Sequence, residues 1–131
     1  MSRPRTDHHA LMRLRVLLAV VALGFAGRVL AQAVPPGFVA SPDIYKVIAE
    51  NDKYRVIEVT WTPGQKDLPH SHPDAAVYYL TNCTMRNLFP GRPPIEGSPI
   101  AGTARIQPPI ASHTVENIGS TDCRLIMFEP K

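Results

Sequence analysis

His70, His72 and His113 are the residues whose types and spacing point most directly to chemistry. The first two stand at positions i and i+2, which in an extended strand places both imidazole rings on one face. The third follows forty-one residues after His72. Neutral imidazole is a common ligand for divalent transition metals, and three ligands that leave a position open are typical of catalytic sites. The sequence therefore predicts a single metal site made of these three histidines.

A purely structural role is the alternative interpretation, because the three histidines could also persist in a binding module that holds no metal. Without a metal, however, two histidines on one strand face would leave ring nitrogens inside the fold that need other partners. We therefore favour metal binding.

The expected cofactor is one divalent transition metal. An all-nitrogen site with open positions suits zinc, copper, nickel or iron(II), with manganese as a further candidate, and the Irving–Williams order favours copper and zinc over iron. Because the ligands are neutral, the ion would keep its full charge and could act as a Lewis acid on an oxygen-bearing substrate. No general base stands out. The polar candidates, each of which packing or a solvated strand face also explains, are Glu58, Tyr78, Tyr79, Arg105 and Glu116.

Residues 1–33 have the layout of a secretory signal peptide. Arginines at positions 3, 5, 13 and 15 form a positive start, and residues 16–26 make an apolar stretch too short to span a bilayer. Small residues then permit cleavage after Ala31 or Ala33. An uncleaved N-terminal anchor is the alternative, although Gly27 and Arg28 end the apolar run early. We therefore expect a periplasmic or secreted protein whose residues 34–131 form one domain.

The basic character of the whole chain comes from this leader. Residues 1–33 hold five of the 14 Lys and Arg residues and one of the 11 acidic residues, which leaves nine basic and ten acidic side chains in residues 34–131. No basic stripe remains there, so we expect no nucleic-acid partner, and no membrane contact once the leader is removed. A small-molecule ligand or substrate is the expected partner, and the sequence leaves a homodimer open.

Cys83 and Cys123 are the only cysteines. An even pair in an exported chain is most simply a disulfide. The two positions are 40 residues apart, and closing a loop of that length could add roughly 3–4 kcal/mol to the stability of a small domain. Two buried free thiols are the alternative. A Cys–His metal site is less favoured, because neither cysteine stands at ligand spacing from a histidine.

Residues 34–131 have the pattern of short strands separated by turns, with no competing helix. Segments rich in valine, isoleucine and aromatic residues are 45–49, 54–61, 76–81, 85–89, 103–107, 113–116 and 124–128. Residues 50–53 are predicted to form a hairpin turn, and the proline-rich segment 89–99 a loop throughout. Many short strands with frequent turns favour an all-β sandwich or barrel.

Two motifs in this part of the chain resemble those of the cupin family. The first motif of that family runs Gly, five residues, His-x-His; the second runs Gly, five residues, Pro, four residues, His, three residues, Asn. The matching residues are Gly64, His70, His72, Gly102, Pro108, His113 and Asn117. The resemblance covers residues 45–130 and implies an all-β, jelly-roll β-barrel in a single domain, with the three histidines as metal ligands.

The chain departs from the cupin motifs at three places. The glutamate ligand of the family would fall near Ala76 or Val77, neither of which can bind a metal, and this leaves a three-histidine variant. Cys83 stands where the first motif ends in glycine, and Ile110 replaces a glycine of the second. Asp74 is a weaker candidate ligand, because the proline before it is expected to turn the chain away from the histidine pair.

The resemblance implies an exported metal-binding cupin. Three-histidine cupins include dioxygenases, so the chain could be a metal-dependent enzyme, either a dioxygenase or a lyase or isomerase, acting on a small oxygen-bearing molecule. The alternative is a non-catalytic module that binds a small ligand or a metal. In a jelly roll the strand ending near Cys83 lies antiparallel beside the strand beginning near Cys123, which would bring the two sulfurs together. Asn117 is predicted to support the turn after His113 rather than to bind the metal.

Overall fold

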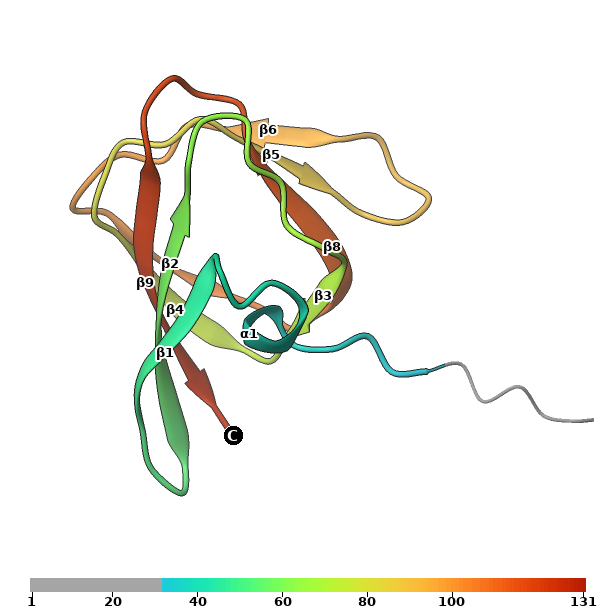
Figure 1. The fold of residues 1–131 in the computed structure, drawn as a ribbon, viewed down its shortest axis with the longest axis vertical. Helices are drawn as coiled ribbons and strands as arrows, with labels where there is room; N and C mark the ends of the chain where they lie inside the picture. Colours follow the sequence, from blue (N-terminus) through green and yellow to red (C-terminus); the bar gives the residue numbers. More distant parts are fainter. Residues whose placement is uncertain (1–31) are drawn as a thin grey trace, which may run out of the picture. The chain divides into compact units, whose positions relative to one another are not determined.

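Two antiparallel β-sheets account for about half of residues 32–131, the part of the chain that this computed structural model describes. One sheet has five strands in the order β1-β2-β9-β4-β7, and the other has four in the order β3-β8-β5-β6 (Figure 1). The elements are α1 (Gly37–Ala40), β1 (Tyr45–Glu50), β2 (Tyr54–Trp61), β3 (His70–His72), β4 (Ala75–Tyr79), β5 (Met85–Leu88), β6 (Ile95–Gly97), β7 (Ala104–Gln107), β8 (Ile110–Asn117) and β9 (Cys123–Pro130). The predicted all-β fold is confirmed. The predicted signal peptide, residues 1–33, lies outside the described residues except for its last two positions.

The long pair β2–β9 lies within the five-stranded sheet. The two strands stay in register from Tyr54↔Pro130 to Trp61↔Cys123. Alternate side chains of each strand point into the barrel, because successive residues of a strand face opposite sides of the sheet. The inward side chains of these two strands form much of the apolar core, and they include Ile57, Val59, Trp61, Leu125 and Met127.

Each of the predicted strand segments is present; 54–61 matches β2 at both ends, and the ends of the other segments differ by at most three residues. The predicted turn at 50–53 joins the antiparallel strands β1 and β2. Within it, Asn51 Oδ1 accepts hydrogen bonds from the backbone N–H groups of Lys53 and Tyr54, both at 2.9 Å. A side chain that satisfies turn backbone in this way is the reason asparagine is frequent in such turns.

The prediction that residues 89–99 form a loop throughout is wrong for residues 95–97. These residues form β6, which pairs antiparallel with β5 and makes a hairpin. Pro93 and Pro94 lie before the strand, and β6 is an edge strand that bonds to a neighbour on one side only, so the nearby prolines do not prevent pairing. Gly91, with φ of 68°, supplies the left-handed conformation within the connecting turn.

A short helix was not expected, yet α1 precedes β1. Its first residue, Gly37, lies against the ring of Tyr45, and a Cβ atom there would stand 3.0 Å from two ring carbons. Glycine therefore permits α1 to pack closely on a tyrosine that, as described below, contacts His70. Among residues 32–131 no helix has the length and apolar character needed to cross a bilayer.

The structure contains a disulfide between Cys83 and Cys123, with 4.9 Å between the two Cα atoms. β4 and β9 are antiparallel neighbours, with Tyr79 opposite Leu125. The chain leaving β4 therefore passes close to the start of β9, as the jelly-roll arrangement implied. The disulfide links the loop before β5 to the first residue of β9.

Candidate metal centre

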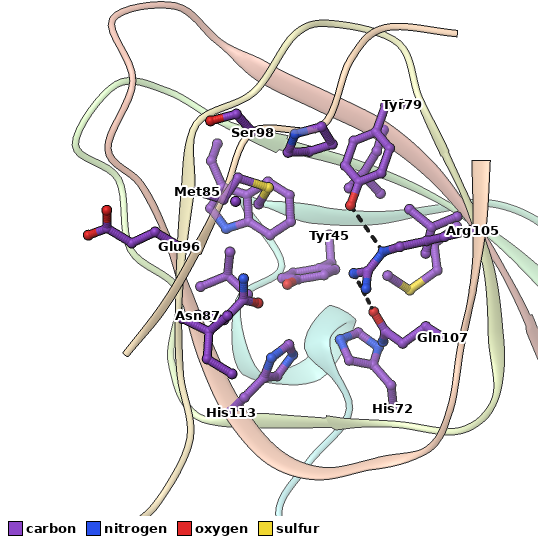
Figure 2. Close-up of a pocket in the computed structure, with 18 residues that line it drawn as sticks. Tyr45, His72, Tyr79, Met85, Asn87, Glu96, Ser98, Arg105, Gln107 and His113 are labelled. Carbon is purple, nitrogen blue, oxygen red and sulfur yellow. Dashed lines mark hydrogen bonds between the residues drawn. The ribbon is translucent and has the colours of Figure 1, made fainter. Parts of the chain in front are cut away.

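The barrel contains a partly open cavity of about 390 Å³. Apolar side chains form much of its wall, among them Trp61, Val77, Met85, Leu125 and Met127. Polar side chains also reach into it, and Figure 2 shows five of them: His72, Tyr79, Arg105, Gln107 and His113. A cavity of this size, mostly apolar with a few convergent polar groups, is typical of a small-molecule site.

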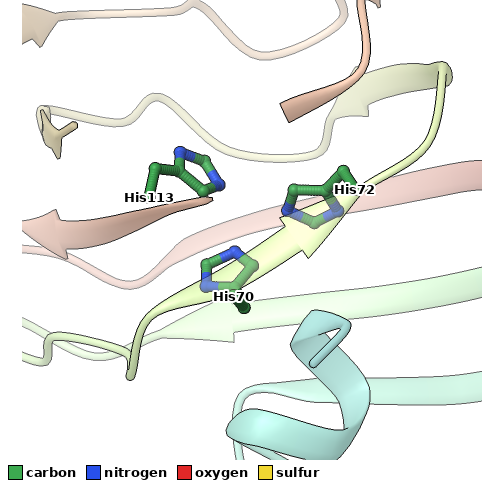
Figure 3. Close-up of side chains that lie close together, drawn as sticks. All are labelled: His70, His72 and His113. Atoms are coloured by element: carbon green, nitrogen blue, oxygen red, sulfur yellow. The ribbon is translucent and has the colours of Figure 1, made fainter. Parts of the chain in front are cut away.

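Strands β3 and β8 bring the three histidines together (Figure 3). His70 and His72 lie on β3, and His113 on β8 stands opposite His70 in the antiparallel register. One ring nitrogen of each lies within 4.8 Å of those of the other two, and the residues are 0%, 6% and 4% exposed in chain order. The structure thus gathers the residues predicted as ligands, while their binding of an ion stays a prediction.

Hydrogen bonds through Nδ1 hold two of the three rings. His72 Nδ1 lies 2.7 Å from Oε1 of the buried Glu129, and His70 Nδ1 lies 2.8 Å from the carbonyl oxygen of Leu68. A ring that donates its proton from Nδ1 keeps Nε2 unprotonated, which is the state that a metal ligand requires. Nε2 of His70 is 3.0 Å from the hydroxyl of Tyr45. An ion would compete with this hydroxyl for the single lone pair of Nε2, and the hydroxyl proton can be donated to Asp67 instead.

His113 differs from the other two histidines because neither of its ring nitrogens has a hydrogen-bond partner. Within residues 32–131, the buried side-chain nitrogen and oxygen atoms without a partner are both nitrogens of His113 and Nε2 of Gln107, and both residues line the same cavity. A buried polar group without a partner costs roughly 1–3 kcal/mol, so such groups call for an explanation. A divalent ion that accepts the lone pair of His113 would explain part of this cost, and the three-histidine set fits such an ion.

Asp67 supports the cluster from the side of His70. The Asp67 carboxylate is 3% exposed and accepts hydrogen bonds from the Tyr45 hydroxyl at 2.8 Å, from Trp61 Nε1 at 3.1 Å and from the backbone N–H of Val115 at 2.6 Å. Burial, and next the negative charge of Asp67, raise the pKa of Tyr45 well above its ordinary value. Tyr45 therefore stays a protonated phenol beside His70.

Burial disfavours positive charge on the histidines. It is the main cause that lowers the pKa of His113 to about 3, and nearby His70, His72 and Arg105 lower it further. Burial also lowers the pKa of His70, against the opposing effect of Asp67. His70 and His113 are therefore neutral near pH 7, with ring lone pairs available to a cation.

Two of the polar candidates from the sequence line the cavity, namely Tyr79 and Arg105. Arg105 donates from Nε to the Tyr79 hydroxyl at 3.1 Å and from a terminal nitrogen to Gln107 Oε1 at 2.8 Å. The other candidates lie outside the cavity lining, namely Glu58, Asp74, Tyr78 and Glu116. Of these, Glu58 and Glu116 form ion pairs with arginines. Asp74 is exposed and is not part of the histidine group.

Asn117 lies at the end of β8 and is fully buried. Its Nδ2 donates to the carbonyl oxygens of Trp61 at 2.9 Å and Thr121 at 2.8 Å, and its Oδ1 accepts from the N–H of Gly119 at 3.0 Å. These contacts hold the turn that leads into β9, and the amide has no contact with the histidine group. The geometry is compatible with the predicted supporting role.

Sequence reasoning missed three buried polar residues around the site: Asp67, Gln107 and Glu129. Strand alternation carried a signal for two of them. Glu129 has the same phase as the inward Leu125 and Met127, and Gln107 has the same phase as Arg105. Asp67 precedes the short strand β3 in an irregular segment, where no period marks the direction of a side chain.

Solved structures of cupins are similar to this chain. A cupin domain from Bordetella pertussis has a TM-score of 0.62 and 24% identity, over 67% of this chain and 92% of that chain. A double-stranded β-helix protein from Klebsiella pneumoniae has a TM-score of 0.54 and 21% identity, over 66% and 75% of the two chains. A cupin from Methanocaldococcus jannaschii with a double-stranded β-helix fold has a TM-score of 0.53 and 10% identity, over 66% and 78%.

No family model and no curated protein matches the sequence. The structural similarities establish the fold: this chain is a cupin-type β-barrel, as the two sequence motifs predicted. Within that barrel the three-histidine group is a candidate metal site.

Proposed function

We propose that this protein is an exported cupin that binds one divalent transition metal through His70, His72 and His113 and presents it to a small oxygen-bearing molecule in the cavity. The observation that carries the proposal is the buried, unpartnered imidazole of His113 beside two histidines whose Nδ1 atoms are already engaged. Zinc, copper, iron(II), nickel and manganese are the candidate ions, since an all-nitrogen set does not choose among them by ligand type alone.

The protein residues around the site have separable roles in this proposal. Glu129 and the carbonyl group of Leu68 orient the two rings of β3, and an acceptor at Nδ1 makes a histidine a better ligand. Tyr45 stays protonated and donates to Asp67, which fixes its hydroxyl oxygen beside His70. A bound ion would supply Lewis-acid chemistry to an oxygen ligand. The apolar wall would exclude water and accept the hydrocarbon part of a ligand.

Two functions remain in competition for this site. The first is a metal-dependent enzyme, a dioxygenase or a lyase or isomerase. The second, a non-catalytic module that binds a small ligand or a metal, is favoured by one observation: the only carboxylate in the described cavity lining is Glu96, which is exposed and paired with Arg86 at 2.9 Å. A general base with an available carboxylate is therefore not in place among those residues.

Export is supported by the disulfide, because such bonds persist in oxidising compartments. The signal peptide is proposed to be residues 1–33, with cleavage after Ala31 or Ala33. N-terminal sequencing of the protein from the periplasm or medium tests this directly. A first residue at position 32 or 34 supports export with cleavage, whereas an intact N-terminus in the membrane fraction supports an anchor.

The metal proposal is tested on protein purified from the exported fraction without a histidine tag and without added metal. Elemental analysis should find one transition metal per chain. The variant with alanine at all three histidine positions should hold none, and each single alanine variant should bind much more weakly, because the ion loses a third of its protein ligands. Asp74→Ala is the matched control and should keep one ion, since Asp74 is exposed and outside the histidine group.

The same preparations separate the enzyme from the binding module. Metal-loaded protein and the His113→Ala variant are incubated with candidate small acids and ketones, while oxygen uptake is recorded and substrate conversion is followed by NMR. Turnover that disappears with His113 supports an enzyme. Tight ligand binding without turnover supports the module.

A further inference from the structure

Tyr79, Arg105 and Gln107 form a group of hydrogen-bond donors on one side of the cavity, which we call the donor wall (Figure 2). Arg105 and Gln107 stand two positions apart on β7, so their side chains share one face of the sheet, and Tyr79 comes from the neighbouring strand β4. The guanidinium group bonds to both of its neighbours, at 3.1 Å to the Tyr79 hydroxyl and at 2.8 Å to Gln107 Oε1.

These internal bonds occupy acceptors and leave donors available. Gln107 is 2% exposed. Its carbonyl oxygen accepts a hydrogen bond from Arg105, whereas the Nε2 group of Gln107 has no partner. Tyr79 accepts from Arg105 and is 5% exposed, so its own O–H proton still needs an acceptor. A buried amide N–H₂ without an acceptor is costly, and an acceptor-rich ligand would remove that cost.

The charge of Arg105 is also uncompensated within the described part of the chain. Arg55, Arg86 and Arg124 each form an ion pair with a glutamate, whereas the two contacts of Arg105 are with neutral side chains. Arg105 itself is exposed, but its charge has no paired carboxylate and lies between two buried neutral side chains that can donate hydrogen bonds, and this arrangement suits a ligand group with one negative charge.

We infer that the donor wall binds the carboxylate of a small organic acid. The planar guanidinium group matches the two oxygens of a carboxylate, and Gln107 Nε2 and the Tyr79 hydroxyl add neutral hydrogen bonds. Val77 and Met127 in the apolar lining would accept the hydrocarbon part of the same molecule. The inference deepens the proposed function, since it names the ligand class for that cavity, but the donor wall contains no metal ligand and can be tested without an ion.

The test compares an acid with its neutral analogue. The probes are 4-methylpentanoate and 4-methylpentanamide, which differ only in the group that would meet the donor wall. Affinities are measured by calorimetry or NMR titration on chelator-treated protein and on metal-loaded protein. The acid should bind roughly tenfold tighter than the amide, or more, in both forms, because it alone carries a negative charge that can form an ion pair with Arg105. The side-chain amide resonance of Gln107 should shift with the acid.

Gln107→Glu is the decisive variant. It keeps the Oε1 acceptor of Arg105 and replaces the unpartnered N–H₂ by an anionic oxygen, which would neutralise the arginine and repel a carboxylate. The affinity for the acid should fall by roughly 10- to 100-fold, while the unfolding temperature stays the same or rises. Arg92→Gln, which removes an exposed arginine outside the cavity lining, is the control and should bind the acid normally.

The inference is overturned if acid and amide bind equally, if Gln107→Glu keeps the affinity of the natural sequence, or if inorganic phosphate binds more tightly than the acid. If Gln107→Glu fails to fold, Arg105→Gln is measured in its place, and it should lose the preference for the acid over the amide. Metal content is measured on the same samples. Acid selectivity in protein that takes up no ion when metal is supplied would contradict only the metal proposal, and a full metal site without acid selectivity would contradict only the carboxylate site.

Discussion

The two ends of β9 lie in regions that differ in how completely their buried polar groups are hydrogen-bonded. At its start, Cys123 forms the disulfide with Cys83, and the turn before it is held by three hydrogen bonds of Asn117. Near its end, Glu129 contacts His72, beside a histidine whose ring nitrogens have no partner. The first region has its polar groups satisfied internally, and the second keeps some of them available.

This difference separates structural from ligand-binding roles on physical grounds. Buried polar groups that satisfy one another contribute to the fold and need nothing further, as Asn117 does. Buried polar groups without partners lower the stability of the free protein unless a ligand completes them, as at His113 and Gln107. If the comparison is correct, changes at the disulfide end should affect folding and leave metal binding intact, and changes at the histidine end should do the reverse.

Removal of the disulfide should have the largest effect. The Cys83→Ser/Cys123→Ser double variant should lose about 3–4 kcal/mol of unfolding free energy, because the crosslink closes a loop with a sequence separation of 40. Denaturant titration measures the loss, and elemental analysis below the unfolding transition should still find one ion per chain. Loss of the ion in folded protein would show that the two ends are not independent.

Asn117→Ala should come next, with a loss of roughly 2–3 kcal/mol. The substitution leaves the carbonyl oxygens of Trp61 and Thr121 and the N–H of Gly119 without their partner, and the bond to Trp61 lies in a buried region. Thermal and denaturant unfolding report the change, and metal content should remain at one. A variant that folds with normal stability and lacks the ion would place Asn117 among the ligands.

Glu129→Gln should weaken metal binding, in contrast to the two variants above, which should weaken the fold. The amide cannot accept the His72 Nδ1 proton as strongly as a carboxylate, so metal affinity should fall by roughly 10- to 100-fold. Competition with a chromophoric chelator measures the affinity. Glu58→Gln, which alters a surface glutamate paired with Arg124, is the control and should leave the affinity unchanged. Equal affinities for both variants would contradict an orienting role for Glu129.

The last prediction concerns pH and applies to the metal-free protein, in which the change within one pH unit is smaller than the effects above. The pKa of His113 is about 3 when folded, against 6.5 ordinarily, so between these values the unfolded chain binds a proton that the folded chain does not. Unfolding free energy should therefore fall as pH drops below about 6.5, by at most about 1.4 kcal/mol per pH unit from this residue. The His113→Gln variant should show a shallower slope in denaturant titrations at several pH values, and identical slopes would contradict the assignment.

Motif spacing and strand alternation predicted most of the fold and part of the site. The pair His70-x-His72 and the position of His113 predicted a cluster because β3 and β8 are neighbours in the jelly roll. The edge strand β6 was missed because prolines before it obscure a strand of three exposed residues. Asp67 was missed because it accepts hydrogen bonds from residues that are distant in sequence, Tyr45 and Val115. No local sequence pattern predicts such long-range contacts.

Trp61 gives the site a built-in optical reporter. It is the only tryptophan of the chain, its indole N–H is bonded to the carboxylate that also holds Tyr45, and its ring lines the cavity. Intrinsic fluorescence excited at the indole band therefore originates from one place. A paramagnetic ion such as copper(II) at the histidines should quench this emission, whereas zinc should not, and a ligand entering the cavity should change its wavelength. Occupancy can thus be followed in the natural sequence without a label.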